Sequence, residues 1–289
     1  MRSARPLILD FDDSTGVVDN AMRIDLRPWQ DRIRFGCTLT TFNTLREHLA
    51  ARWPEHHGTV LMGSGDYHHV SWLLIERIKM REPSDVVVLD NHPDNMLFPF
   101  GVHCGSWVRK VALLPQVRHV HVLGICSQDI SSAAAWQNYK QPLEAGKLSY
   151  WCCGVDVSWA ARKGLEGAFH RFEDPSVLVR SFCAQLQSQQ VYLSIDKDVF
   201  APEVVRTNWD QGRMTLEDAR VLIGTLSGRL IGSDITGEVS LFHYQSWWKR
   251  LLSALDAQPA IPAAQITDWQ VSQQSLNRSL LALIAQASV

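Results

Sequence analysis

The sequence predicts an α/β fold with a mainly parallel central sheet and helices on both of its faces. Short apolar runs rich in β-branched residues alternate with segments whose apolar residues recur at helical spacing. Such alternation is typical of parallel sheets, in which a helix connects successive strands and covers the sheet. Two of the strand-like runs end abruptly in acidic residues, and the carboxyl ends of parallel strands are where α/β proteins bind their ligands.

Six segments have the composition and length of strands. They are residues 6–9, 58–62, 86–89, 119–123, 191–195 and 229–232. Five segments have helical apolar spacing, namely residues 41–52, 70–80, 176–188, 215–226 and 269–287. Thr215 begins one of these helices with a capping box, because Asp218 stands three residues later. Residues 131–171 have no regular period, so we expect an irregular segment with a short strand or a lid.

Composition limits the class of protein. The chain has 289 residues, 46% hydrophobic and 20% charged, without a repeat or a domain boundary in its sequence, which predicts a single domain over 1–289. The net charge of −2 gives no argument for a nucleic acid or an anionic membrane as partner. No apolar run approaches membrane-spanning length, and the first six residues lack the apolar core of a signal peptide. The six cysteines have no C-x-x-C spacing, which favours reduced thiols in a cytoplasmic protein.

The two acidic strand ends predict a metal site. Asp90, His92 and Asp94 follow the strand 86–89, and alternate residues of an extended segment point the same way. Asp196 and Asp198 follow the strand 191–195 in the same manner. Four carboxylates and an imidazole brought together would repel and desolvate one another unless cations lay between them. We therefore expect a metal site, and the number of carboxylates favours two ions.

Three further segments bear on this site. Gly63 and Gly65 lie in a strand-to-helix turn that ends in His68 and His69, at the start of the helix 70–80. A histidine, His103, follows the first acidic cluster by a short loop. A third strand end carries Asp234 and, four residues later, Glu238.

Taken in order, these motifs resemble those of the ureohydrolase superfamily, the arginases and agmatinases. The family carries Gly-Gly-Asp-His-Ser, Asp-Ala-His-x-Asp, His-Gly, Ser-x-Asp-x-Asp-x-x-Asp-Pro and a late Asp-x-x-Glu. The second element is complete at Asp90, His92 and Asp94. Ser194-Ile195-Asp196-Lys197-Asp198 and Pro202 match the fourth, although Ala201 replaces its last acid. The resemblance spans residues 58–240 and implies a divergent member with an arginase-like three-layer α/β/α fold.

The resemblance also implies a cofactor and a reaction. It implies two Mn(II) per chain, bridged by Asp90 and Asp196, with Asp94 and either His68 or His69 on one ion and His92 and Asp198 on the other. A metal-bridging hydroxide would then hydrolyse a linear C–N bond of a small-molecule guanidino, amidino or amide substrate. His103 would shuttle protons, and Glu238 would hold a cationic group of the substrate. Relatives of this kind are commonly oligomeric, which makes a homo-oligomer possible.

The chain departs from the family pattern at three further points. The family's Asp-His-Ser reads Asp66-Tyr67-His68-His69 here, so the first histidine ligand has moved and either His68 or His69 could replace it. Asp234 and Glu238 are one residue further apart than in the family. The loop 95–102 is short and apolar, whereas arginases use polar residues there to hold the amino-acid end of the substrate, which disfavours arginine itself.

Two other functions are consistent with parts of the sequence. The segment Leu7 to Ser14 resembles the start of a haloacid-dehalogenase-type phosphatase, in which Asp10 would be the nucleophile and Asp12 the acid or base. That reading leaves both acidic strand ends unexplained. Alternatively, the altered position of Tyr67 fits an arginase fold that no longer catalyses a reaction and binds a small molecule or a protein instead.

Overall fold

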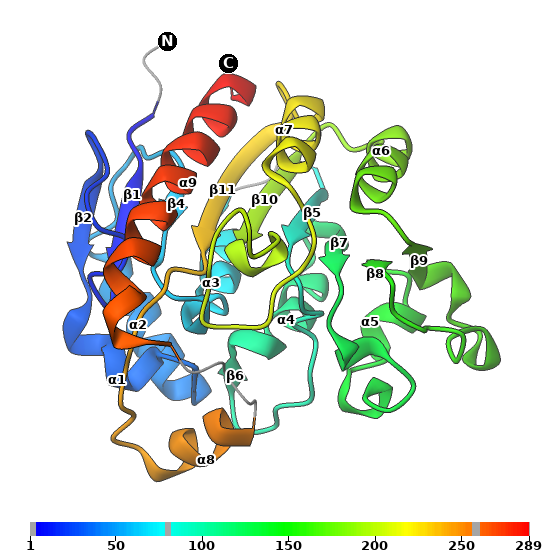
Figure 1. Ribbon diagram of the computed structural model, residues 1–289, viewed down its shortest axis with the longest axis horizontal. Coiled ribbons are helices and arrows are strands. Elements are labelled where there is room, and N and C mark those ends of the chain that lie inside the picture. Colours follow the sequence, from blue (N-terminus) through cyan, green and yellow to red (C-terminus); the bar gives the residue numbers. More distant parts are fainter. Residues whose placement is uncertain (1–3, 79–81, 256–260, 289) are drawn as a thin grey trace.

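The computed structural model describes residues 4–78, 82–255 and 261–288. A nine-stranded sheet forms its centre, and each pair of neighbouring strands in it is parallel (Figure 1). In spatial order the strands are β2 (Met22–Asp25), β1 (Leu7–Asp10), β4 (Val60–Leu61), β11 (Leu230–Thr236), β10 (Val191–Asp196), β5 (Ser84–Leu89), β7 (Val117–Ile125), β8 (Leu148–Cys153) and β9 (Phe169–Phe172). A separate antiparallel pair, β3 (Gly36–Cys37) and β6 (Val102–His103), lies beside this sheet.

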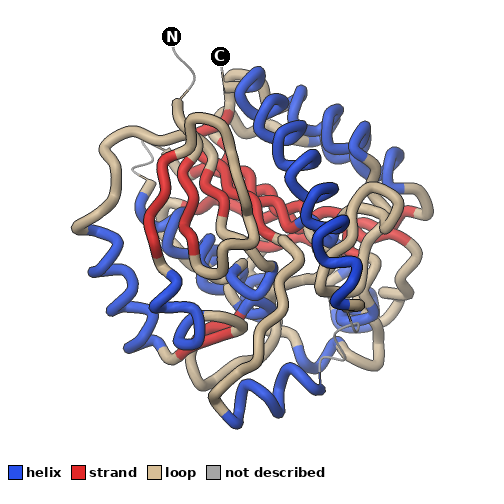
Figure 2. Tube along the Cα trace, turned by 60° about the vertical axis from the view of Figure 1, so that its left-hand side comes forward, coloured by secondary structure: helices blue, strands red, loops and turns tan. Residues whose placement is uncertain are grey.

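Helices cover both faces of the sheet (Figures 1 and 2). The helices are α1 (Gln30–Ile33), α2 (Leu39–Ala50), α3 (Val70–Arg77), α4 (Val108–Ala112), α5 (Gln141–Glu144), α6 (Pro175–Gln185), α7 (Leu216–Thr225), α8 (Trp247–Leu255) and α9 (Ile266–Ala287). Alternate residues of β5 enter two different cores, because side chains alternate across a strand. Val86 and Val88 pack with α2, α3 and α4, whereas Val87 and Leu89 pack with α6, α7 and α9. The three-layer α/β/α fold predicted from the sequence is therefore confirmed.

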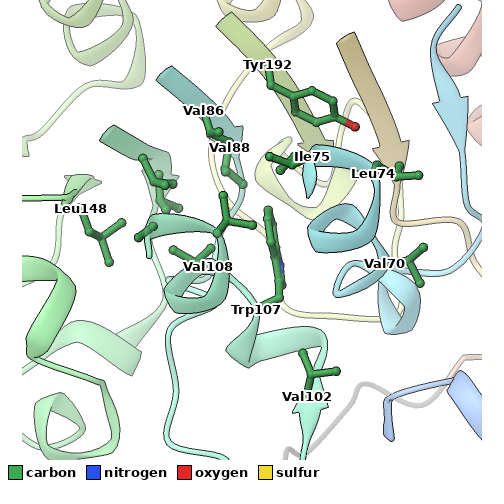
Figure 3. Packing of buried hydrophobic residues seen from close by; sticks show 14 of the residues in the cluster. Val70, Leu74, Ile75, Val86, Val88, Val102, Trp107, Val108, Leu148 and Tyr192 are labelled. Atoms are coloured by element: carbon green, nitrogen blue, oxygen red, sulfur yellow. The ribbon is translucent and has the colours of Figure 1, made fainter. Parts of the chain in front are cut away.

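The first of these cores reaches the carboxyl end of the sheet. Figure 3 shows Trp107, at the start of α4, between Val86 and Val88 of β5 and Ile75 of α3. Trp107 is fully buried, and its indole N–H donates to Asp94 Oδ2 at 2.6 Å. The packed core thus fixes one of the acidic side chains that follow β5.

The six predicted strands and five predicted helices all form, with ends shifted by a few residues. The predicted helix 70–80 corresponds to α3, and its last two residues lie outside the described part of the chain. The sequence did not predict β2 or β9, which are four-residue strands at the edges of the sheet. The stretch 131–171 contains β8, a fully buried six-residue strand, so the short strand expected there is present.

None of the helices within the described ranges combines the length and the apolar character needed to cross a membrane.

Candidate metal centre

The acidic residues meet because β5 and β10 are neighbours in register. Leu89 pairs with Ile195, so Asp90 and Asp196 lie side by side at the same edge of the sheet. Asp196 also caps the short helix η8 (Lys197–Val199), since its Oδ1 accepts a hydrogen bond from the Asp198 N–H at 3.1 Å. The cap turns Asp198 back toward the carboxylates that follow β5.

His68, Asp90 and Asp94 form a first group that could hold a metal ion. The Nδ1 atom of His68 lies 3.1 Å from Asp90 Oδ2 and 3.0 Å from Asp94 Oδ2. It is also 3.5 Å from Asp196 Oδ2. All four residues are buried. Asp94 has a φ of 45°, in the left-handed region that aspartate tolerates better than most residues.

Asp90, His92 and Asp198 form a second group, and it shares Asp90 with the first. His92 Nδ1 lies 3.0 Å from Asp198 Oδ2 and 3.5 Å from Asp90 Oδ1. One oxygen of Asp90 therefore faces each group. A carboxylate that presents its two oxygens to two neighbouring donor sets has the arrangement needed to bridge two ions.

The electrostatics of these residues fit a cation site. Burial, followed by the charge of Asp90, raises the pKa of both Asp94 and Asp198 to about 7. Burial and the charge of Asp198 raise the pKa of Asp196 well above its usual value. Burial alone would lower the pKa of His68, but the neighbouring carboxylates of Asp90 and Asp94 raise it well above the usual value. Without a metal, protons must supply the positive charge that these carboxylates require.

The donor chemistry of the site also fits a metal. Asp90 Oδ2 and His68 Nδ1 are buried, face each other at 3.1 Å and form no properly directed hydrogen bond. Buried polar atoms without a hydrogen-bond partner are uncommon, and they often lie at a site where an ion would bind them. Four carboxylates and two imidazoles form a mixed oxygen and nitrogen set suited to a fairly hard divalent ion.

The structure places His68, and not His69, against the carboxylates. The turn η2 (Gly65–Tyr67) is capped by Ser64, whose side chain accepts from the Asp66 N–H, and His68 follows it directly. The His69 ring instead lies 6.1 Å from the ring of Phe42, and burial lowers its pKa well below the usual value. Of the two histidines, His68 is therefore the one placed to bind an ion together with Asp90 and Asp94.

A chain of hydrogen bonds orients His68. The Ser194 hydroxyl donates to Asp234 Oδ1 at 2.7 Å, so it must accept from His68 Nε2, which is 2.9 Å away. Asp234 also accepts from Ser71 and Tyr192 and is fully buried. Because Nε2 donates its proton to Ser194, Nδ1 is the nitrogen that faces the carboxylates and could bind an ion there.

His103 lies in the wall of the same cavity. Its Nδ1 accepts from the Gly105 N–H at 3.0 Å, so the neutral ring carries its proton on Nε2. The ring lies between Phe35 and Phe98, with ring centroids 5.9 Å and 4.5 Å away. Burial in this apolar setting lowers the pKa of His103 to about 4, so the ring is uncharged at neutral pH.

Glu238 has contacts that the sequence did not predict. Its Oε1 lies 2.6 Å from the ammonium of Lys197 and accepts from the Asn277 side-chain N–H at 2.6 Å. Both charged side chains are almost completely buried, and Glu238 does not line the cavity that contains the metal-binding groups. Lys197 already supplies the positive charge beside Glu238. In this arrangement Glu238 is therefore not placed to make the contact with a cationic group of the substrate that the sequence had predicted.

The cavity at this site has a volume of about 260 Å³. It is lined by Gly65, His68, Asp90, His92, Asp94, Met96, His103, Cys104, Gly105, Asp129, Gln137, Asp196, Asp198, Trp209 and Asp210. Sequence reasoning missed Asp129, Trp209 and Asp210. Trp209 and Asp210 lie on an irregular loop, and Asp129 lies in the short 3₁₀ helix Gln128–Ile130 after β7. Asp210 makes the closest contact to a predicted ligand, because its Oδ1 lies 2.8 Å from His92 Nε2.

Asp10 and Asp12 have other partners and do not line the cavity. Asp10 pairs with Arg23 at 2.7 Å. Asp12 accepts from the Ser14 hydroxyl at 2.6 Å and lies 3.3 Å from the buried guanidinium of Arg34. A nucleophile and an acid should face a shared substrate cavity, so the structure does not support the phosphatase interpretation.

Comparison with known proteins gives few sequence matches and many structural ones. No family model matches the sequence. An uncharacterized protein of Thermotoga maritima is 30% identical over 186 residues, which is 64% of this chain. The match spans only 60% of the length of that relative.

Solved structures resemble the whole chain. Proclavaminate amidino hydrolase from Streptomyces clavuligerus matches with a TM-score of 0.57 and 16% identity over 99% of this chain and 94% of its own. Agmatine ureohydrolase of Thermoplasma volcanium matches with a TM-score of 0.54 and 12% identity over 98% of this chain and 91% of its own. Formimidoylglutamase from Bacillus subtilis matches with a TM-score of 0.50 and 12% identity over 99% and 88%. The chain therefore has the three-layer α/β/α fold found in these amidino hydrolases and ureohydrolases.

Proposed function

We propose that this protein is a divergent member of the ureohydrolase superfamily, a hydrolase of linear C–N bonds that uses two Mn(II) ions per chain. One observation carries the proposal, namely the two donor groups that share Asp90. The fold of the whole chain, common to an amidino hydrolase and an agmatine ureohydrolase, agrees with it. The substrate is proposed to be a small molecule with a guanidino, amidino or amide group.

The residues divide into two sets of ligands under this proposal. His68 and Asp94 would hold one ion, and His92 and Asp198 the other, with Asp90 between them. Asp196 lies 3.5 Å from His68 Nδ1 and is proposed as the second bridging carboxylate. Bound in this way, two Mn(II) ions would lower the pKa of a water enough to provide hydroxide near neutral pH.

The protein residues around the ions would position the substrate and move protons. His103 stays uncharged at neutral pH and carries its proton on Nε2, so it is proposed as the proton shuttle. The rings of Phe98 and Trp209 border the site and would exclude water from the substrate. Glu238 would hold a cationic group of the substrate only if its ion pair with Lys197 opened, because Glu238 is paired in its present position.

The protein is further proposed to act in the cytoplasm, and a homo-oligomer remains compatible with the fold.

The metal proposal is tested by elemental analysis after manganese loading. Wild-type protein should retain about two Mn(II) per chain, and Asp90→Asn should retain almost none, because the shared carboxylate serves both ions. Asp19→Asn, at an exposed position, is the control and should retain both. Release of urea or ammonia from guanidino and amide compounds then tests the reaction. Wild-type protein without metal above background would contradict the proposal.

A further inference from the structure

We infer that Asp210 is a positioning residue that aims His92 at one of the two ions. The inference rests on the proposed metal-dependent function and concerns a residue outside the strand-end motifs. It follows from the contacts of the two nitrogen atoms of His92, from the way in which Asp210 is held, and from the contrast with His68.

The two nitrogens of His92 face different surroundings. Nδ1 lies 3.0 Å from Asp198 Oδ2, within the second donor group. Nε2 lies 2.8 Å from Asp210 Oδ1. When Nδ1 binds an ion, the ring keeps a single proton on Nε2, and the Asp210 carboxylate accepts the hydrogen bond from it. The Nδ1 lone pair of the neutral ring is then directed at the metal-binding group, as in carboxylate–histidine–metal triads.

Asp210 is fixed although its side chain is 64% exposed. The side-chain amide of Asn91 donates to both Asp210 Oδ2 and the Asp210 carbonyl at 3.0 Å. The Asn91 backbone N–H donates to Asp198 Oδ1 at 3.0 Å, and its side-chain oxygen accepts from the Cys126 N–H at 3.1 Å. Asn91 therefore links Asp210 to the ends of β5, β7 and η8.

The loop that carries Asp210 is also tied down on its other side. The Gly212 N–H donates to the Asp198 carbonyl at 2.7 Å. The side-chain amide of Gln211 donates to the carbonyls of Phe200 and Val205 at 3.0 Å and 2.8 Å. Asp210 thus reaches His92 from a loop whose position depends on the same strand end that provides Asp198.

The two histidines are oriented by different means. His68 is oriented by Ser194 and the fully buried Asp234, whereas His92 is oriented by a carboxylate at the open side of the cavity. Loss of Asp210 should therefore affect the ion held by His92 and leave the ion held by His68 in place. A general loss of folding stability would instead weaken both ions.

The experiment compares Asp210→Ala, Asp210→Asn and Asp129→Asn in the full-length protein. Asp129 also lines the cavity but contacts neither histidine, so its replacement controls for the loss of one negative charge near the ions. Calorimetric titration with Mn(II) measures both affinities. The electron paramagnetic resonance spectrum at two equivalents reports whether the ions are magnetically coupled, and thermal unfolding of the metal-free proteins reports folding.

We expect Asp210→Ala to weaken one Mn(II) by about 10- to 100-fold and to leave the other within about 2-fold of wild type. Its spectrum should contain more of the signal of isolated Mn(II). Asp210→Asn keeps an acceptor for His92 and should recover part of the affinity, and Asp129→Asn should leave the ratio of the two Mn(II) affinities as in wild type.

Three results would overturn the inference. They are unchanged affinities in Asp210→Ala, an equal loss of both ions in that variant, and a loss of the same size in Asp129→Asn. Wild-type protein that binds no Mn(II) would instead remove the proposed function, and the inference with it, so the wild-type titration separates the two failures.

Discussion

At the scale of single residues, the choice between His68 and His69 depends on one turn of the chain. Both histidines are buried, and their order in the sequence does not distinguish them. The 3₁₀ turn η2 rotates the chain so that His68 reaches the carboxylates while His69 lies against Phe42. The sequence identifies His68 and His69 as candidate ligands. It does not predict how one 3₁₀ turn is rotated, and this rotation decides which of the two reaches the carboxylates.

The two histidines should therefore respond differently to replacement by alanine. His68→Ala should bind one Mn(II) per chain in place of two, because it removes a ligand of one group only. His69→Ala should keep both ions and lose about 1–3 kcal/mol of unfolding free energy, as expected for a buried side chain. Metal analysis and denaturant unfolding of both variants measure these effects. Unaltered metal content in His68→Ala would show that this histidine is not a ligand.

At the scale of elements, the interior of the sheet was predictable and its edges were not. The central strands β5 and β10 are continuous apolar runs, which is the pattern of strands buried on both faces. The edge strands β2 and β9 have only four residues each, with exposed positions, and so carry little signal. Because β5 and β10 are clear in the sequence, the acids at or after their ends could be predicted as site residues, namely Asp90, Asp94, Asp196 and Asp198. Asp210 lies on a loop without such a pattern and could not be predicted.

The ion pair between Lys197 and Glu238 joins the end of β10 to the loop after β11. Lys197→Met should destabilise the protein by about 3–5 kcal/mol, because Glu238 would remain buried without its cation. The double variant Lys197→Met with Glu238→Gln removes both charges and should recover part of that loss. Denaturant unfolding of the metal-free proteins measures both. A double variant less stable than Lys197→Met would contradict this account.

The loop between β5 and β6 affects the choice of substrate. Met96 lines the cavity, Phe98 packs on His103, and Phe100 is 77% exposed. The ammonium and carboxylate of arginine would lose water against this surface without new partners, at a cost of a few kcal/mol. We expect kcat/KM for L-arginine at least about two orders of magnitude below that for a guanidino or amide compound with an apolar tail. Comparable urea release from L-arginine would contradict the prediction.

At the scale of the whole molecule, the metal site should make stability depend on pH. Folding raises the pKa of Asp94 and Asp198 to about 7, so the folded metal-free protein binds more protons than the unfolded chain between about pH 4 and pH 7. The stabilisation that comes from protonating Asp94 and Asp198 in the folded state is fully present below their pKa in the unfolded chain. It is lost as the pH rises through their pKa in the folded protein. The metal-free protein should therefore be less stable at pH 8 than at pH 5, by on the order of 5 kcal/mol for the two groups together.

Thermal unfolding at several pH values checks this dependence. Asp94→Asn should weaken it, because an amide does not titrate and only the Asp198 part would remain. Manganese should reverse it, since Mn(II) replaces protons most readily where the carboxylates ionise. A metal-free protein that gains stability from pH 5 to pH 8 would contradict the predicted sign.

The order of the strands has a consequence for synthesis of the chain. β10 and β11 are the last two strands along the sequence, yet they lie between β4 and β5 in the sheet. A ribosome therefore releases two separate groups of strands, and they can join only after Thr236 has emerged. Until then β4 and β5 present open edges, which favour pairing with other chains. His68 and Asp90 are synthesised well before Asp196 and Asp198. A complete metal site can therefore form only on a nearly finished chain.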